Sequence, residues 1–335
     1  MTDLAELGEF GLIRRIAPRF SRILPEGVTG IGDDCAVIPQ GDETLLVTTD
    51  MLVEDVHFLR DKISPFDLGY KSLAVNLSDI AAMGGTPTAA FLCLALPKQV
   101  TVDWLDQFFE GFQTLAETAA APLLGGDTTG SRQRLIINVA VLGKAQDRLI
   151  KYRSAAVAGD KICVTGRLGD SGGGLQLLIN NLEQESDADG RALLQAHHSP
   201  RPHLEEGRWL AAQPAVHAMM DVSDGIDSDV RRIMEASNVG AMIYLEKLPI
   251  SHQLAKTASR WGWNAVELAA TGGEDYCLLC TIPADQFDQL AAGFVEKFGR
   301  PLHCIGEITT GGSLNYQRNG TPIDLRTHGW DHFKE

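Results

Sequence analysis

The sequence DLGYKSLAVNLSDIAAM at residues 67–83 determines much of how the first half of this chain folds. On one side of this segment, apolar residues recur at α-helical spacing, namely Leu73, Leu77 and Ile80. On the neighbouring side, polar residues recur at the same spacing, namely Ser72, Asn76 and Asp79. The first side is suited to a core, and the second turns away from that packing surface. We therefore predict a helix that carries Asp79 near its C-terminal end, before the glycines at 84–85.

Segments on both sides of this helix alternate between strand and helix patterns. A β-branched and leucine-rich run at 44–49 ends at Asp50 and predicts a strand, and an apolar run at 89–96 predicts another. A helix is predicted over 102–120 and a further strand over 135–143. This alternation predicts a mixed α/β fold (α+β mixed) in which a sheet packs against helices.

The length of 335 residues suggests two domains. A polar and basic stretch followed by small residues at 147–159 precedes a new strand at 161–165, so we place the boundary there. Residues 1–148 are predicted to form an N-terminal domain of sheet plus helices, and residues 149–335 a C-terminal α/β domain.

Seven acidic clusters lie along the chain beside glycines, hydroxyl groups or predicted strand ends. They are Gly-Asp-Asp at 32–34, Thr-Thr-Asp at 48–50, Asn-Leu-Ser-Asp at 76–79, Gly-Gly-Asp-Thr-Thr at 125–129, Gly-Asp-Ser at 169–171, Asp-Val-Ser-Asp-Gly at 221–225 and Gly-Gly-Glu-Asp-Tyr at 272–276. Carboxylates brought together repel one another unless cations lie among them. Mg²⁺ with a polyphosphate suits such oxygen ligands, so the clusters predict a metal-dependent enzyme that acts on phosphates.

The composition excludes several classes of protein. A net charge of −15 argues against nucleic-acid binding, which needs a basic surface. The N-terminus lacks a secretory signal pattern, and the longest apolar run, at 89–96, is far shorter than the ~20 residues of a membrane helix. Cys277 and Cys280 have C-x-x-C spacing, but they lie in a predicted buried strand without a second pair or a nearby histidine. We expect free thiols and a cytoplasmic location.

The first two clusters predict metal ligands. Beside the glycines of the first cluster, Asp34 is the first choice as ligand and Asp33 the second, while the alternative is an Asx-type turn. Asp50 is predicted as a ligand because it ends a buried strand, although a cap at the strand end would look similar. The oxygens of Thr48 and Thr49 are candidate additional ligands.

The later clusters each have an ordinary alternative. A negative charge at Asp79 opposes the dipole at the C-terminal end of a helix, which favours a functional role over a solvated surface position. The glycines at 125–129 allow a phosphate to approach the backbone, but a plain β-turn has the same pattern. Asp221 and Ser223 share a face if extended, and Ser223 or Asp224 is otherwise a helix N-cap.

Other residues carry weak signals alone. The motif at 272–276 is placed for ligand contact or for a hairpin turn. His57, Arg153 and Trp330 are, in isolation, more often structural or solvated. The glycine-rich segment 169–174 is suited to an anion at a helix N-terminus or, more often, to a close-packed helix entry. The chain has no P-loop, so any ATP must be held mainly through metals.

These motifs, in this order and over nearly the whole chain, resemble the thiamine-monophosphate kinase family. The matching segments are residues 8–10, 30–36, 48–58, 71–84, 125–129, 221–226 and 272–276. That family belongs to a superfamily with aminoimidazole ribonucleotide synthetase, selenophosphate synthetase and a hydrogenase-maturation protein. The resemblance implies ATP-dependent phosphorylation of thiamine monophosphate to thiamine diphosphate with several Mg²⁺ ions, which is the last step of thiamine diphosphate biosynthesis. It also implies a homodimer joined through the strands of the N-terminal domains.

The resemblance further assigns roles to individual residues. The implied metal ligands are Asp34, Thr48, Thr49, Asp50, Asp79, Asp127, Asp221 and Asp224, of which Asp50, Asp79 and Asp224 are also the implied catalytic residues. The implied nucleotide contacts are Gly126, Asp127, Arg153 and Ser223, and the implied substrate contacts are His57, Glu274 and Trp330. Trp330 matches only as an aromatic residue before Asp-His-Phe.

The expected chemistry agrees with these motifs. A phosphate monoester has a second pKa of about 6, so the acceptor is largely a nucleophilic anion at neutral pH and needs no strong general base. Two alternatives remain, which are another ATP-dependent activation in the same superfamily and a non-catalytic Mg-nucleotide sensor. The first cysteine, Cys35, lies inside an acidic motif and the chain ends in Lys334-Glu335, which disfavours the selenophosphate and hydrogenase-maturation reactions.

Overall fold

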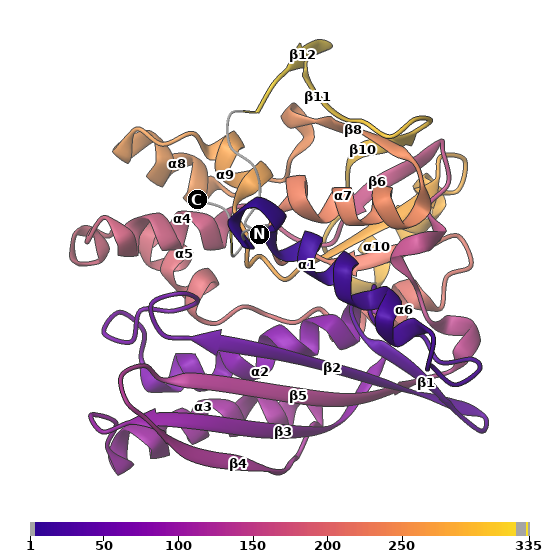
Figure 1. Ribbon diagram of the computed structural model, residues 1–335. Helices are drawn as coiled ribbons and strands as arrows, with labels where there is room; N and C mark the ends of the chain where they lie inside the picture. Colours follow the sequence, from indigo (N-terminus) through magenta and orange to yellow (C-terminus); the bar gives the residue numbers. More distant parts are fainter. Residues whose placement is uncertain (1–3, 326–332, 334–335) are drawn as a thin grey trace.

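The computed structural model describes residues 4–325 and 333 of the chain. Two β-sheets, each with its own helices, make up the structure (Figure 1). The five-stranded sheet comes from the first half of the chain, and the seven-stranded sheet from the second half. The predicted mixed α/β class is confirmed, and the position of the domain boundary remains a prediction.

The first sheet has the strand order β1-β2-β5-β3-β4. Its strands are β1 (Ala36–Gln40), β2 (Glu43–Val53), β3 (Thr86–Pro97), β4 (Leu123–Ser131) and β5 (Ile136–Ala145). Neighbouring strands are antiparallel except β3 and β4, which are parallel. Alternate residues of β2 are buried, as expected for a sheet with one covered face. Helices α2 (Pro65–Ala82) and α3 (Val102–Ala119) cover that face, while the other face is open to the viewer in Figure 1.

Helix α2 connects the two halves of the molecule. Ser64 caps its N-terminus by accepting a hydrogen bond from the backbone N–H of Asp67, and Pro65 occupies the first turn. The helix contacts β2, β3 and β5 on one side and α6 and β7 on the other. Ala81 and Ala82 belong to an apolar cluster that is otherwise built from the second half of the chain. For this reason α2 has almost no exposed side.

The second sheet has the strand order β12-β11-β8-β10-β6-β9-β7. Its strands are β6 (Asp160–Val164), β7 (Met219–Asp221), β8 (Gly240–Tyr244), β9 (Leu278–Pro283), β10 (His303–Thr309), β11 (Leu314–Arg318) and β12 (Thr321–Ile323). The α-helices of this half are α4 (Asp170–Ile179), α5 (Ala188–His198), α6 (Leu204–Ala211), α7 (Ile226–Ser237), α8 (His252–Trp261), α9 (Ala265–Thr271) and α10 (Phe287–Phe298). Short 3₁₀ turns are η1 (Asp147–Leu149), η2 (Arg153–Ala155), η3 (Glu183–Glu185) and η4 (Leu245–Lys247).

The N-terminal helix α1 (Leu4–Ser21) lies against the second half of the chain (Figure 1). Gly8 interrupts it with φ 69° and ψ 173°, a conformation that favours glycine. The Arg232 guanidinium of α7 lies over the Phe10 ring, and Arg14 pairs with Glu235. The helix thus links its own half to α7.

One local expectation was wrong, and one alternative is excluded. Asp50 does not end its strand, because β2 continues to Val53 in register with β5. The segment 125–129 is not a turn, because it lies within β4 at the edge of the first sheet. Backbone hydrogen bonds to β3 hold β4 in place. The glycine-rich sequence of this segment did not indicate a strand.

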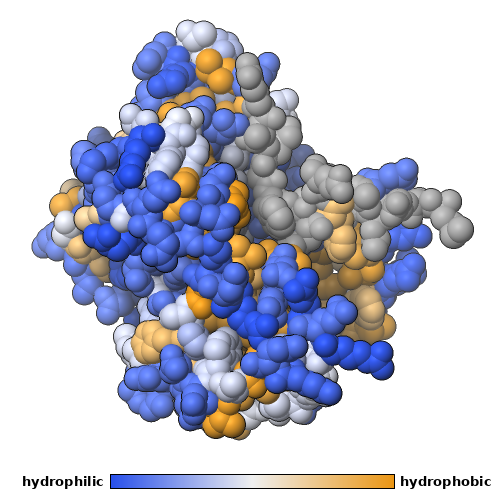
Figure 2. Space-filling view, turned by 90° about the vertical axis from the view of Figure 1, so that its left-hand side faces the viewer, coloured by the Kyte–Doolittle hydropathy of each residue, from blue (hydrophilic) through white to orange (hydrophobic). Residues whose placement is uncertain are grey.

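Among the residues that the structure describes, no helix has the length and apolar character needed to cross a membrane. The face shown in Figure 2 is largely hydrophilic, with hydrophobic residues in small groups between polar ones.

Candidate active site

Three carboxylates from distant parts of the chain meet between the two sheets. Asp34 precedes β1, Asp79 lies on α2, and Asp221 ends β7. One ligand oxygen from each lies within 4.8 Å of the others. No other group of three or more acidic, histidine or cysteine ligands is this close within residues 4–325 and 333. We call Asp34, Asp79 and Asp221 the carboxylate cluster.

Helix α2 contributes both a member of the cluster and a donor to it. Ser78 is fully buried, and its hydroxyl donates to Oδ2 of Asp221 at 2.6 Å. The hydroxyl of Thr48 donates to Oδ2 of Asp79. The predicted polar stripe of this helix exists, but Asn76 is completely buried rather than solvated.

Asp50 lies beside the cluster on β2. Its backbone N–H donates to the side-chain carbonyl of Asn76 at 3.0 Å, which fixes β2 against α2. Burial raises the pKa of Asp50 to about 6, and the negative charges of Asp224 and Asp34 add to that rise. Asp50 and Asp224 therefore extend the acidic site beyond the three central residues.

Without cations, the ionised form of the buried carboxylates Asp221 and Asp79 is unfavourable, and their pKa values are raised. The pKa of Asp221 rises to about 8, first because of burial and then because of the charge of Asp34. Burial also raises the pKa of Asp79 well above its ordinary value, and the charges of Asp50, Asp221 and Asp34 act in the same direction. Such groups favour either protons or metal cations.

Arg153 supplies positive charge at one side of the site. Its Nη2 lies 2.5 Å from Oδ1 of Asp34, and its Nε lies 3.3 Å from Oδ2. The backbone N–H of Arg153 donates to Oδ2 of Asp33 at 3.2 Å. Burial, followed by the charge of Asp34, raises the pKa of Asp33 to about 7. Of the two adjacent acids, Asp34 is the one in the carboxylate cluster.

Other predicted site residues lie apart from the cluster. Asp127 is on the exposed edge strand β4, in register with Cys93 of β3, whose other partner is Asn138 of β5. At ~4.8 Å per strand, three strand spacings of about 14 Å separate β4 from β2. Gly126 has φ 155°, and a Cβ there would lie 1.7 Å from the carbonyl oxygen of Leu92. Within one chain, these two residues do not join the carboxylate cluster.

Thr49 points away from the cluster. Its hydroxyl donates to the carbonyl oxygen of Val139 at 3.0 Å and accepts from Nδ2 of Asn138 at 3.0 Å. The same amide group donates to the carbonyl oxygen of Asp50 at 3.0 Å. Asn138 therefore orders this part of β2, a role that no motif in the sequence indicated.

Glu274 belongs to a second polar group between the two halves. Lys71 of α2 is 1% exposed, and its Nζ lies 2.9 Å from Oε2 of Glu274. His197 Nδ1 lies 3.2 Å from the same oxygen. The backbone of Glu274 has φ 64°, and its N–H donates to the carbonyl oxygen of Ser223 at 2.7 Å. Glu274 is thus held by both halves of the chain.

Two predicted substrate contacts remain, and the structure describes only the first of them. The ring of His57 is half-buried, and its Nδ1 accepts from the backbone N–H of Val53 at 3.0 Å. Because Nδ1 is the acceptor in this bond, it carries no proton there. Trp330 lies outside the described residues.

The glycine-rich entry to α4 does not present a vacant anion site. The carboxylate of Asp275 accepts from the backbone N–H groups of Gly169 at 2.6 Å and Ser171 at 3.3 Å. A Cβ at Gly174 would lie 2.3 Å from the carbonyl oxygen of Leu193. Close helix packing therefore explains these glycines. The alternative that Ser223 or Asp224 caps α7 is also disfavoured, because the N-cap is Gly225.

Asp229 was missed by the sequence reasoning. It is completely buried on α7, and its Oδ2 has no hydrogen-bond partner among the described residues. Burial raises its pKa well above the ordinary value, and the charges of Asp224 and Asp221 add to that effect. The usable signal was an aspartate on the first turn of the helix that follows the 221–225 motif.

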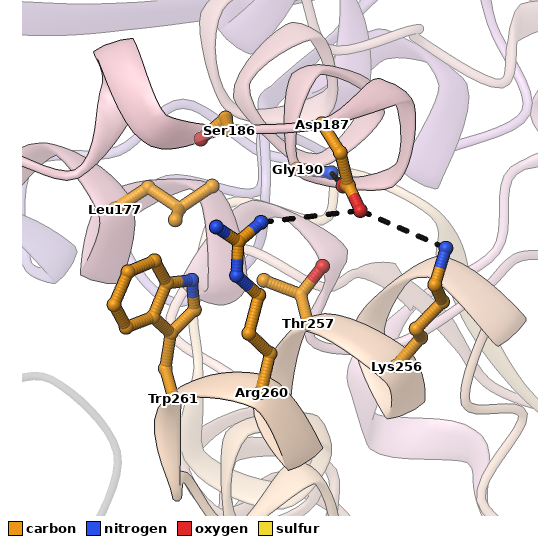
Figure 3. Close-up of a pocket in the computed structure, with 8 residues that line it drawn as sticks. All are labelled: Leu177, Ser186, Asp187, Gly190, Lys256, Thr257, Arg260 and Trp261. Atoms are coloured by element: carbon orange, nitrogen blue, oxygen red, sulfur yellow. Dashed lines mark hydrogen bonds and ion pairs between the residues drawn. The ribbon is translucent and has the colours of Figure 1, made fainter.

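Two cavities lie in the second half of the chain. One of about 210 Å³ adjoins the second polar group and is lined by Arg167, Ser171 and Asp275, among others. The other, of about 50 Å³, lies between α4, α5 and α8 (Figure 3). Figure 3 shows Lys256 and Arg260 directed at Asp187, with N–O distances of 3.6 and 4.0 Å. None of the residues that line the small cavity belongs to the carboxylate cluster.

The sequence matches two family models. Residues 32–145 match "AIR synthase related protein, N-terminal domain", and residues 157–318 match the corresponding C-terminal domain. A protein named thiamine-monophosphate kinase from Salmonella typhimurium is 39% identical over 97% of this chain and 98% of its own. Its namesake from Bacillus subtilis is 35% identical over 98% of this chain and 100% of its own. A solved structure described as AaThiL complexed with AMPPCP and TMP has a TM-score of 0.86 and 33% identity, covering 99% of both chains.

Proposed function

Because this chain belongs to the thiamine-monophosphate kinase family, we propose that it transfers the γ-phosphoryl group of ATP to thiamine monophosphate. The products are thiamine diphosphate and ADP. The observation that carries this proposal is the carboxylate cluster, whose three ligand oxygens lie within 4.8 Å. Donor and acceptor both present anionic phosphate groups, so the reaction needs concentrated positive charge between them, and this cluster is suited to collecting cations.

The donor set of the site fits Mg²⁺. The residues that we assign to it offer only oxygen, namely Asp34, Asp50, Asp79, Asp221 and Asp224, with Thr48 hydrogen-bonded to one of them. Mg²⁺ prefers such hard ligands and keeps several positions for water and substrate phosphates. When bound, it supplies charge neutralisation and alignment for in-line phosphoryl transfer. Asp229 lies close enough to Asp224 and Asp221 for their charges to raise its pKa, and its Oδ2 has no hydrogen-bond partner among the described residues.

Arg153 is assigned to the nucleotide phosphates. In this structure its guanidinium neutralises Asp34. Cation binding by Asp34 removes the need for that pairing, so the guanidinium becomes available to a bound phosphate. Ser223, which follows β7 and adjoins Asp224, is assigned a nucleotide contact on the family resemblance. Neither residue needs to transfer a proton in the reaction.

The acceptor is assigned to the side of the site where Glu274 lies. Its carboxylate is suited to the cationic thiazolium ring, and Lys71 and His197 position it there. His57 and Trp330 are proposed as further contacts to the acceptor. The phosphate of the acceptor is already an anion near neutral pH, so these residues bind and orient rather than activate it.

We further propose a homodimer in which a second copy covers the open face of the first sheet. That face and its edge carry exposed apolar side chains, including Met51 (55% exposed) and Leu124 (63% exposed). Monomeric proteins rarely leave such a set of apolar residues uncovered on one face. Gly126, Asp127 and Thr49 lie on these strands, so their assigned roles with nucleotide and metal depend on what the second copy brings near them.

We also propose a cytoplasmic location and the domain limits 1–148 and 149–335. All six cysteines are free, which suits a reducing compartment. The proposed limits separate the strands of the two sheets, since β5 ends at Ala145 and β6 begins at Asp160.

The activity is tested by incubating the purified full chain with ATP and Mg²⁺ and each of three acceptors. Thiamine monophosphate is compared with thiamine and with no acceptor, and EDTA serves as the metal control. We expect ADP and thiamine diphosphate only with the monophosphate and the metal. Tight ATP binding without any acceptor-dependent ADP would instead support a sensor or another reaction of the superfamily.

A further inference from the structure

A row of sulfur-containing side chains crosses the second sheet, with Cys304 at one end and Met219, two residues before Asp221, at the other. Cys304 of β10 is opposite Cys163 of β6, Cys163 is opposite Cys280 of β9, and Cys280 is opposite Met219 of β7. Directly opposed residues of neighbouring strands point to the same face. All four belong to or pack against the apolar cluster that contains Phe294 of α10. Three thiols are thereby placed side by side under one helix.

The thiol at the end of this row differs from the other two. Cys304 is half-buried, whereas Cys163 and Cys280 are 0% exposed. A hydrogen bond joins the thiols of Cys304 and Cys163. This bond is the main reason that the pKa of Cys304 falls to about 6, and the cations Lys247 and Lys161 act in the same direction against the effect of burial. When protonated, Cys304 donates to the carbonyl oxygen of Gly306 at 3.6 Å.

The backbone positions of Cys304 and Cys163 are compatible with a disulfide between them. Opposed residues on antiparallel strands have Cα atoms roughly 4.5–5.5 Å apart. Disulfides join Cα atoms about 4.4–6.8 Å apart. The two ranges overlap, so the strands need no large displacement for a disulfide to form. A thiolate that is accessible and that adjoins a second thiol has the arrangement of a redox-reactive pair.

We propose that Cys304 and Cys163 form a peroxide-reactive thiol pair that closes a reversible disulfide between β10 and β6. The Cys304 thiolate attacks one oxygen of a hydroperoxide, the O–O bond breaks, and Cys304 sulfenic acid and hydroxide form. The sulfur of Cys163 then attacks the sulfenic sulfur, and the S–O bond breaks. The released hydroxide takes the Cys163 proton. With hydrogen peroxide, two thiols lose two electrons in total, and the peroxide is reduced to two molecules of water.

The proposal is tested on the reduced full chain treated with a small excess of hydrogen peroxide. The remaining thiols are alkylated under denaturing conditions, and non-reducing peptide mapping identifies any disulfide. We expect the loss of two of the six thiols, a crosslinked peptide pair containing Cys163 and Cys304, and full recovery of six thiols after dithiothreitol. The wild-type map alone tests the proposal, even if a variant fails to fold.

Two variants and a matched control identify the order of events. In Cys163→Ser, dimedone is expected to trap a sulfenic acid at Cys304, and in Cys304→Ser no disulfide forms. Cys93→Ser is the control, because Cys93 is exposed but lies on the other sheet, and its disulfide yield is expected to equal that of wild type. Retention of all six thiols, a disulfide of Cys163 with Cys280, or irreversible oxidation of Cys304 in the wild type would overturn the proposal.

Discussion

The aspartates of the acidic site are buried and repel one another. This repulsion destabilises the folded protein without metal and favours the binding of cations. Asp79 and Asp221 each accept a hydrogen bond from a hydroxyl group, but neither has a basic residue as a direct partner within the described part of the chain. Their raised pKa values show that ionised carboxylates are held here at an energetic cost. A divalent cation removes this cost, so binding and stability should be linked at single residues.

The first prediction concerns Asp79→Asn. Turnover with ATP, Mg²⁺ and thiamine monophosphate is expected to fall by ~1000-fold, because losing a metal-binding carboxylate removes several kcal/mol of charge stabilisation. The metal-free variant should keep its circular dichroism spectrum and unfold at the same or a higher temperature, since one repulsive charge is gone. Asp42→Asn, at an exposed turn, is the matched control. Turnover within threefold of wild type would remove Asp79 from the metal site.

The second prediction is a pH dependence of the metal-free protein. The pKa of Asp221 is about 8 in the folded state, against 3.8 for an ordinary aspartate, so between these pH values the folded state binds the proton and the unfolded state does not. Its contribution to stability is full below pH 4 and is lost as the pH rises towards 8. Thermal unfolding in EDTA should show a smaller decline over this range for Asp221→Asn than for wild type.

Mg²⁺ should reverse the direction of this effect. The ion competes with protons, so it should raise the unfolding temperature of wild type more at pH 8 than at pH 5. Equal shifts at both pH values, or an unchanged pH profile in Asp221→Asn, would show that Asp221 is not a buried titrating carboxylate.

The third prediction concerns Lys71, a buried lysine that the sequence analysis did not single out. Lys71→Met leaves Glu274 without its cation, so stability should fall by about 3 kcal/mol and the KM for thiamine monophosphate should rise more than that for ATP. Lys144→Met is the control, because its pair with Glu43 is exposed and should contribute below about 1 kcal/mol. Equal changes in both KM values would mean that Lys71 has only a structural role.

At the scale of elements, α2 and α3 approach each other through two glycines. A Cβ on Gly69 would lie 1.9 Å from the carbonyl oxygen of Phe108, and one on Gly111 would lie 1.9 Å from that of Phe66. Backbone atoms cannot yield as side chains do, so this close crossing requires glycine at both positions. Because α2 carries Asp79, the crossing also determines where that carboxylate lies.

The fourth prediction follows from this crossing. Gly69→Ala should lower the free energy of unfolding by roughly 2–4 kcal/mol, because the helices must separate and their apolar contacts weaken. Urea denaturation measures the change. Gly130→Ala is a suitable control, since no atom lies within 4 Å of its added Cβ. A stable Gly69→Ala protein would show that α2 and α3 are not packed as closely as described.

Comparison of elements shows what the sequence could predict. The helix at 67–83 and the strands at 89–96 and 135–143 were found within a few residues, because their periodicity reflects packing against a core. β4 was missed because its glycines carry no strand propensity and its pairing with β3 depends on a partner distant in sequence. The acids of the site were indicated by local motifs. Lys71 and Asn138 were not, since only the tertiary structure determines their burial and their partners.

At the scale of the whole molecule, the open face of the first sheet is the main unexplained surface of a single chain. One face is covered by α2 and α3, while Met51, Phe91 and Leu124 remain exposed on this sheet. Thr49 and Asp127 lie on the same strands, at a distance from the carboxylate cluster. The proposed second copy, packed there, would account for both the apolar residues and the separated site residues.

The fifth prediction tests this assembly. Leu124→Glu is expected to convert a dimer into a monomer in light scattering coupled to size-exclusion chromatography, because it buries a charge in the proposed contact. Ile179→Glu is the control, since Ile179 is 53% exposed on α4 in the other half of the chain. A monomeric wild-type protein, or a dimer that both variants retain, would exclude this face as the interface.

The central claim is that the carboxylate cluster between the two halves holds the cations used in phosphoryl transfer. The most direct measurement is the number of Mn²⁺ ions bound per chain by electron paramagnetic resonance, with a non-hydrolysable ATP analogue present. We predict that Asp79→Asn and Asp221→Asn each bind fewer ions than wild type or Asp42→Asn, at unchanged fold. Equal ion counts in all four proteins would contradict the account.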